Sequence, residues 1–284
     1  MKRLLVGVSY AFIILETTLH VKHLLEAMLL YPWFKWNGVQ CDTYGMHVLT
    51  TPSVVAASER ATTQEIPGRS GTLTLLEGDG VYDEVTLGVT CIIDDPFHVE
   101  AGETLDRIAK ISAWLRGSGE VTFYNRTNGY YKGRVSNQIS FDQIVRGNPH
   151  VSFQVQFRCE PYFYLNSGNT PITVTTSTSP YSLANQGNIA SAPLIRLEGT
   201  GEGTIMIGSS SLIVNSFEDI DYVMVDCDAK IAYKGEDANP SDPFTLLNTR
   251  VTGEWPKIET GNSFVTLASG ITKAVITPRW RCIG

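Results

Sequence analysis

Alternating apolar and polar positions dominate the chain from about Trp33 onward. The clearest stretch spans residues 151–159, where every odd position is apolar and every even position is polar. Residues 85–93 show nearly the same alternation. A period of two is typical of β-strands, and one polar face indicates strands that are half-buried in an antiparallel sheet.

One segment after the N-terminal region has the period of a helix. Between Glu103 and Arg116 the apolar residues Leu105, Ile108, Ile111 and Leu115 recur at spacings of three and four, which places them on one stripe. Acidic residues in its first turn and the glycine that follows it suit the two helix ends. One helix laid on antiparallel strands predicts a first domain dominated by sheet.

Turn-forming residues divide the remaining strands. Strand-like segments at 120–125 and 130–135 flank Asn128-Gly129, which predicts a two-residue hairpin turn. Residues 166–171 read as a linker, and residues 173–179 as an edge strand or a loop. Short strands then follow without a helix, which predicts a β-sandwich. They are expected at 194–197, 204–207, 212–214, 222–225, 230–233, 264–267 and 274–276.

Residues 1–27 do not share the strand pattern of the rest of the chain. Lys2 and Arg3 precede a short apolar run that ends before Glu16. Three interpretations stay open: a signal or anchor, an added N-terminal helix, or an upstream extension. No small-residue cleavage site follows the run, and it is shorter than the ~20 apolar residues of a membrane span. We therefore favour an extension, with the functional start near Met28.

Composition narrows the function classes. Of the 284 residues, 43% are apolar and 18% are charged, which suits a chain with buried cores. The net charge is −7 and the basic residues are scattered, so we expect no stable nucleic-acid binding. The five cysteines lie far apart and fit neither a zinc site nor a disulfide scaffold. Cys91 and Cys159 continue alternating apolar patterns and are expected to be buried thiols.

The search for catalytic chemistry finds no triad motif, zinc-protease motif or Walker loop. Three weaker features each have a structural and a functional interpretation. The alternating glycines at 199–203 resemble a phosphate loop, but a strand follows them, which favours a hairpin turn. Acidic clusters at 219–228 and 236–242 favour solvated turns over calcium or acid–base sites. Trp255 and Trp280 could stack on sugars, but core packing is the better interpretation.

Several segments, in this order and spacing, resemble the distal tail protein family of long-tailed, siphovirus-type bacteriophages. They are 34–39 (FKWNGV), 44–48 (YGMHV), 59–60 (ER), 66–73 (IPGRSGTL), 111–117 (ISAWLRG), 130–135 (YYKGRV), 185–188 (NQGN), 191–193 (SAP) and 276–281 (ITPRWR). The likeness runs from about Phe34 to Cys282. Each motif is short, so the order of the motifs carries the resemblance.

The resemblance implies a mainly β, two-domain subunit. Residues 1–27 would be the N-terminal extension, residues 28–165 a β-rich ring-forming tail domain with one helix, and residues 166–284 a galectin-like β-sandwich. Such a subunit would be a structural virion protein, made in the cytoplasm of the host bacterium. It would form a ring-shaped hub, a homohexamer, at the distal end of the phage tail. The chain lacks the long insertions that carry sugar-binding modules in some relatives.

The implied partners are copies of the chain, the tail tube protein, a tail-tip or tail-associated fibre or lysin protein, and a receptor-binding protein. No enzyme activity, cofactor, metal or membrane contact is expected. The ring interface is expected to include Arg60 and Arg69, which lie near Glu59 and Glu65. The alternative function is a carbohydrate-binding sandwich for attachment to the host surface.

Overall fold

The computed structural model describes residues 32–50, 52, 55–76, 80–94, 101–141, 150–235 and 244–284. The N-terminal extension, with the expected start near Met28, lies outside the described residues. So do Glu236, Asp237 and Asp242 of the second acidic cluster. Among the described residues no helix has the length and apolarity needed to cross a membrane.

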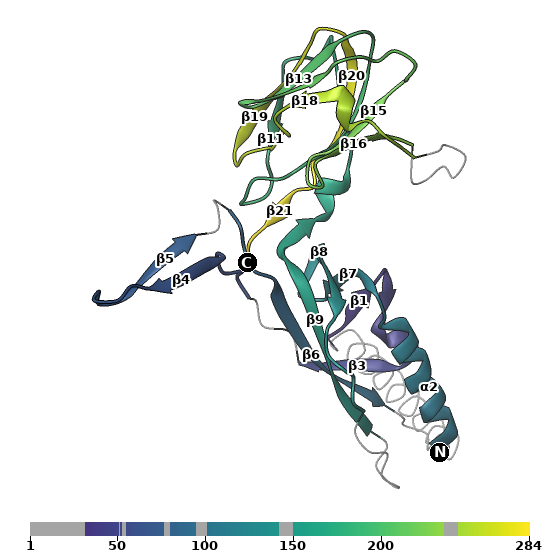
Figure 1. The fold of residues 1–284 in the computed structure, drawn as a ribbon. Helices are drawn as coiled ribbons and strands as arrows, with labels where there is room; N and C mark the ends of the chain where they lie inside the picture. The colour runs from purple at the N-terminus through teal and green to yellow at the C-terminus, as the bar shows by residue number, and fades with distance from the viewer. Residues whose placement is uncertain are drawn as a thin grey trace, which may run out of the picture. The chain divides into compact units, whose positions relative to one another are not determined.

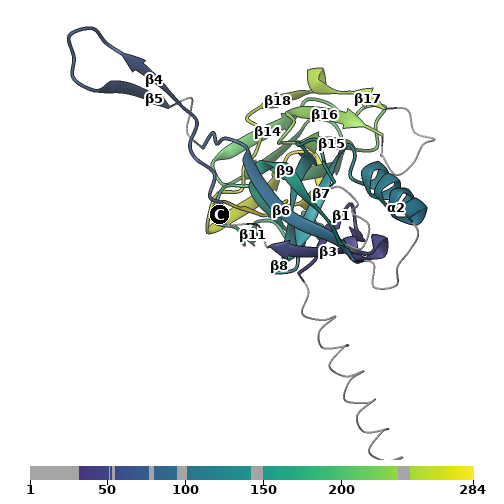
Figure 2. The ribbon, with the colours of Figure 1, turned by 90° about the horizontal axis from the view of Figure 1, so that it is seen from below.

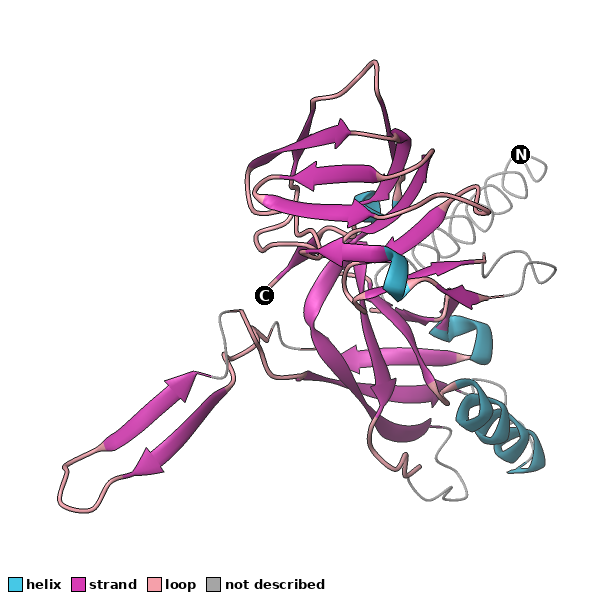
Figure 3. Cartoon of the chain, turned by 45° about the horizontal axis from the view of Figure 1, so that its top comes forward, coloured by secondary structure: helices cyan, strands magenta, loops and turns pink. Residues whose placement is uncertain are grey.

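The described chain is mainly β-sheet, as predicted, and forms two compact units (Figures 1 and 3). The first unit contains the described residues within Met1–Ser53, Leu87–Asn125 and Arg134–Phe157. The second contains those within Val54–Thr86, Arg126–Gly133 and Arg158–Gly284. The units interleave along the sequence, whereas the two expected domains were continuous. Those domain boundaries stay a prediction.

The largest sheet has eight strands in the order β2-β1-β7-β8-β9-β6-β3, with β21 paired to β9. Their bounds are β1 (Phe34–Trp36), β2 (Val39–Gln40), β3 (Met46–Thr50), β6 (Val85–Asp94), β7 (Ser118–Phe123), β8 (Arg126–Val135), β9 (His150–Leu165) and β21 (Arg281–Cys282). The two clearest alternating stretches lie in β6 and β9, so the strand predictions there are confirmed.

The hairpin turn predicted at Asn128-Gly129 is wrong. Strand β8 runs straight through both residues, and the turn lies at Tyr124-Asn125 instead. A glycine was needed for another reason. A Cβ at position 129 would lie 2.1 Å from the backbone oxygen of Tyr164, so the glycine allows two strands to approach closely.

Helix α2 (Ala101–Trp114) is the predicted helix and belongs to the first unit. Ile111 and Leu115 are buried, but Leu105 is exposed, so the apolar stripe contacts the core only in its C-terminal half. Aromatic rings fill the adjoining core. The Phe34 ring stacks on Trp114 at 5.7 Å between centroids and meets Phe157 edge-on at 5.3 Å.

Two sheets enclose a single apolar core in the second unit, which confirms the predicted sandwich. The six-stranded sheet contains β10 (Ile172–Thr175), β20 (Ile271–Thr277), β12 (Leu194–Gly199), β15 (Val223–Asp226), β16 (Ile231–Lys234) and β17 (Thr245–Leu246). The five-stranded sheet contains β11 (Tyr181–Ala184), β19 (Asn262–Ala268), β13 (Gly203–Ile207), β14 (Ser210–Val214) and β18 (Val251–Gly253). Likeness to galectins in particular stays a prediction.

The glycine-rich segment 199–203 joins β12 to β13, which lie in different sheets. The expected hairpin there is therefore wrong, and the segment is a corner between the two layers. Strand β13 follows it, so the geometry of a phosphate-binding loop before a helix is not present at this position.

A separate two-stranded sheet is formed by β4 (Ala61–Glu65) and β5 (Thr72–Leu76). We call β4, β5 and the turn between them, residues 61–76, the arm. Figures 1, 2 and 3 show the two strands side by side.

Candidate assembly surface

The turn of the arm is set by its sequence. The backbone N–H of Arg69 donates to the carbonyl of Ile66 at 3.1 Å, which closes a four-residue turn. Pro67 fits the second position, and Gly68, with φ of +82°, fits the third. Proline followed by a glycine with positive φ is the pattern of a type II turn. The segment therefore folds into a hairpin for local reasons.

The base of the arm is fixed to the segment that returns from it. The Arg60 N–H donates to the carbonyl of Val81 and the Asp83 N–H donates to the carbonyl of Ser58, both at 2.9 Å. Glu59 forms a bridge with Tyr82. These contacts join the two chain segments that flank the hairpin at its base.

The distal part of the arm is exposed. Every residue of β4 is exposed, as are Thr72, Thr74 and Leu75 of β5. The exposed fraction is 49% for Leu75 and 39% for Ile66, which is high for large apolar side chains. Exposed apolar residues on an open strand pair mark an interaction surface or an aggregation hazard.

Both predicted interface arginines lie on or beside the arm. Arg60 forms an ion pair with Asp83, with 3.0 Å between Nε and Oδ1, and the side chains are 44% and 51% exposed. Sequence reasoning had placed Glu59 and Glu65 nearby and missed Asp83, because hairpin pairing brings it close from 23 residues away. Arg69 lies exposed in the turn. Their role in a subunit interface stays a prediction.

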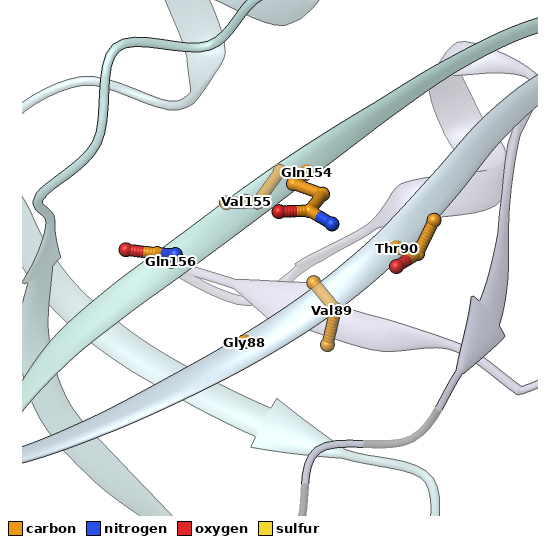
Figure 4. A pocket seen from close by; sticks show the side chains of 6 residues that line it. All are labelled: Gly88, Val89, Thr90, Gln154, Val155 and Gln156. Atoms are coloured by element: carbon orange, nitrogen blue, oxygen red, sulfur yellow. The ribbon is translucent and has the colours of Figure 1, made fainter.

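The first unit also carries a polar groove. It has a volume of about 350 Å³ and is lined by Thr90, Asn137, Gln138, Ser140, Ser152, Phe153 and Gln154. A smaller hollow of about 210 Å³ shares Thr90 and Gln154 with it (Figure 4). The Asn137 side chain bonds to the backbone of Gln154 and Gln156, as a neighbouring strand would. None of the described residues that line the two hollows is charged.

The first acidic cluster spans two turns, at 218–219 and 227–230, and Asp226 lies between them at the end of β15. The expected solvated turn is wrong for Asp226, whose side chain is 16% exposed and ion-paired. The Arg279 guanidinium binds both carboxylate oxygens of Asp226, at 2.9 and 3.0 Å. Burial alone would raise the pKa of Asp226, but hydrogen bonds from Arg279 and from the Ala229 N–H lower it below its ordinary value. Among the described residues no group of His, Cys, Asp or Glu side chains is arranged to hold a metal ion.

The two candidate sugar-stacking tryptophans belong to the sandwich core. Trp280 is 1% exposed, so core packing is the correct interpretation for that residue, and Trp255 is partly buried against the same core. Cys91 and Cys159 are fully buried, as predicted. Burial raises the pKa of each thiol to about 12, so both stay protonated at neutral pH.

Comparison with known proteins places the fold. No family model matches the sequence, and no curated protein matches it. The structure is similar to the crystal structure of the SPP1 Dit (gp 19.1) protein, described as a paradigm of the hub adsorption apparatus in phages that infect Gram-positive bacteria. The TM-score is 0.62 at 17% sequence identity, and the match covers 86% of this chain and 98% of that one. At this identity the likeness establishes that this chain shares the fold of the SPP1 Dit protein.

Proposed function

We propose that this chain is a structural subunit of a phage tail hub, as the SPP1 Dit protein is. The observation that carries the proposal is the extent of the fold likeness, which spans nearly all of the SPP1 protein and both units of this chain. Order and spacing of the sequence motifs support the same family. The chain then works by assembly in the virion and not by catalysis.

The proposed assembly is a hexameric ring at the distal end of the tail. Cyclic assemblies repeat one heterologous contact, in which two different surfaces of each copy meet. The arm and its base, including Arg60 and Arg69, are one candidate for the projecting surface. The ring would join the tail tube protein to a tail-tip or fibre protein and to a receptor-binding protein.

The alternative, a carbohydrate-binding sandwich, loses one of the two tryptophans proposed to contact a sugar. Trp280 is buried, and stacking on a sugar requires an exposed ring face. No other described feature favours this function over the hub.

Mass photometry and negative-stain electron microscopy of the purified full-length protein test the proposal. We expect closed rings whose mass is six times that of the 31.3 kDa chain. A protein that stays monomeric at tens of micromolar contradicts a self-assembling hub. Saturable binding to host-wall polysaccharide by such a monomer would favour the alternative.

The resemblance assigns ring formation to residues 28–165, and a ring built by this domain without the sandwich stays a prediction. Strand β21 pairs with the end of β9, Arg281 opposite Tyr164 and Cys282 opposite Phe163. A chain that ends at Leu165 loses this strand. The full-length protein is therefore the better starting point for assembly experiments.

A further inference from the structure

The side chain of Arg281 contacts three segments of the second unit. Arg281 lies in β21, which pairs with the end of β9 (Figure 1). Its guanidinium lies over the ring of Tyr162 in β9, 4.1 Å from the ring centroid. Its Nε donates to the carbonyl of Ala190 at 2.8 Å, and its Nη1 lies 3.5 Å from Oδ1 of Asp228. Arg281 therefore connects Tyr162 to the loop before β12 and to the turn after β15.

The ring of Tyr162 also contacts the base of the arm, residues 58–60 and 81–83. The Tyr82 ring meets it edge-on, with 6.3 Å between the centroids and 79° between the planes. Tyr82 forms the bridge with Glu59 at the centre of this base. One aromatic ring in β9 is therefore shared by an arginine of β21 and by the base of the arm.

A second link joins β9 to the residue that follows the base. Arg158 and Glu84 form an ion pair, and their side chains are 51% and 45% exposed. Exposed ion pairs contribute little to stability, because water and salt screen them. The Arg281 side chain is 12% exposed, and a cation–π contact is stronger where water is kept away. The ring of Tyr162 is therefore the more effective of the two links.

The two contacts of this ring depend on each other. An aromatic ring is rigid, and edge-to-face packing has a preferred geometry. The guanidinium of Arg281 holds the face of the Tyr162 ring, and Tyr82 packs against the ring in the orientation that results. Without the guanidinium, the Tyr162 side chain gains freedom to change its rotamer, so its contact with Tyr82 weakens.

We propose that Arg281 is a positioning residue that couples the base of the arm to the sandwich through the ring of Tyr162. When the guanidinium leaves the ring, the base opens more often. A binding event that displaces β21 or the turn at Asp228 is thereby transmitted to the arm. This inference goes beyond the proposed hub and does not depend on ring formation.

Hydrogen exchange of the full-length protein tests the coupling, because it reports how often a hydrogen-bonded segment opens. The backbone N–H groups of Arg60 and Asp83 each donate to a carbonyl across the base. Arg281→Met removes the guanidinium and keeps an unbranched side chain. We expect both amides to exchange at least ~5-fold faster, since loss of a partly desolvated cation–π contact corresponds to about this factor. Mass spectrometry of peptides that cover 58–60 and 81–83 measures the rates.

Arg196→Met is the matched control. The Arg196 guanidinium lies over the Tyr222 ring, also at 4.1 Å, and pairs with Glu198 in the same unit. Arg196 belongs to β12, in the interior of the six-stranded sheet. This variant should leave exchange at the base of the arm within ~2-fold of wild type. An equal rise in both arginine variants would reflect a general loss of stability and would contradict the proposal.

Substitutions of Tyr162 test whether the ring carries the coupling. Tyr162→Phe keeps the ring and should exchange as wild type does, whereas Tyr162→Leu should match Arg281→Met. In the Tyr162→Leu background, Arg281→Met should add less than ~2-fold, because the path is already interrupted. Thermal melts check that each variant folds. If Arg281→Met does not fold, Asp228→Asn replaces it, since this carboxylate is 53% exposed, and exchange at the base should then rise ~2-fold. The proposal is wrong if the base exchanges as in wild type after loss of the Arg281 contact, or if that loss has its full effect without the Tyr162 ring.

Discussion

Two hairpins of the second unit have the same local geometry and opposite surroundings. Strands β13 and β14 pair five residues with five, and so do β4 and β5. In the first hairpin, Ile205, Ile207, Leu212 and Val214 form one fully buried face of the sandwich. In the arm, every described side chain is at least partly exposed. Backbone pairing is therefore enough to form a hairpin here, and burial of a face decides whether it belongs to a core.

The largest effect should separate these two hairpins directly. We expect Ile205→Ala to destabilise the protein by about 2–5 kcal/mol, because it leaves a cavity in the sandwich core. Leu75→Ala on the arm should change the free energy of unfolding by less than about 0.5 kcal/mol, because the side chain is exposed. Urea unfolding of both full-length variants measures the difference. Equal losses would show that the arm is part of the cooperative core.

Sequence pattern predicted both strands of the first hairpin, at 204–207 and 212–214, and neither strand of the second. Both strands of β13–β14 place apolar residues at alternate positions, so their shared face was recognisable. Strand β4 has the sequence ATTQE, without a large apolar residue, and only β5 alternates. A strand pattern does not reveal whether a third element packs on it. The exposure of the arm therefore had to come from the structure.

A second contrast lies between two ion pairs. The Asp226 and Arg279 side chains are 16% and 23% exposed, much less than those of the Arg60–Asp83 pair. Arg279→Ala leaves a poorly solvated carboxylate without its partner. We expect the free energy of unfolding to fall by about 2–3 kcal/mol. This is less than the ~3–5 kcal/mol expected for a fully buried pair, because some water reaches this one. Urea unfolding at pH 7 measures it, with Arg279→Lys as a control that keeps the charge.

The same pair has a defined pH dependence. The pKa of Asp226 is lowered in the folded protein, so its contribution to stability is complete above the ordinary pKa of 3.8. That contribution is lost as the pH falls through the lowered folded pKa, where the carboxylate takes up a proton. The penalty of Arg279→Ala should therefore shrink below pH 3.8. A penalty that stays constant between pH 7 and pH 3 would mean that the ion pair is not its cause.

Long-range contacts explain what else the sequence could not predict. Asp226 and Arg279 lie 53 positions apart, and only folding brings them together. The Asn128-Gly129 dipeptide has the composition of a hairpin turn, yet the approach of Tyr164 keeps it within a strand. The interleaving of the two units along the chain has the same origin. Local periodicity identified most strands, and tertiary contacts assigned them to sheets and units.

Two glycines extend the comparison to a packed strand, β8, and the exposed turn of the arm. Gly129→Ala places a methyl group against the backbone of Tyr164, which side-chain rotation cannot relieve. We expect the free energy of unfolding to fall by about 1–3 kcal/mol, as it does when other packed sites receive an extra methyl group. Gly68→Ala has free space around the new methyl group but an unfavourable φ of +82°. It should strain only the exposed turn of the arm and leave the thermal midpoint nearly unchanged, so a matching fall in both midpoints would contradict the contrast.

The smallest effect is expected at the base of the arm. Arg60 and Asp83 are both largely exposed, and exposed ion pairs contribute about 0–1 kcal/mol because water and salt screen them. A double-mutant cycle of Arg60→Ala and Asp83→Ala should therefore give a coupling energy below about 1 kcal/mol. Raising the salt concentration to 1 M should reduce it further, since the Debye length is then about 3 Å. The backbone hydrogen bonds at Ser58 and Val81 remain in every variant of the cycle. If the coupling exceeded about 2 kcal/mol and did not respond to salt, the pair would lie in a covered environment, as in an assembled interface, and not on a free surface.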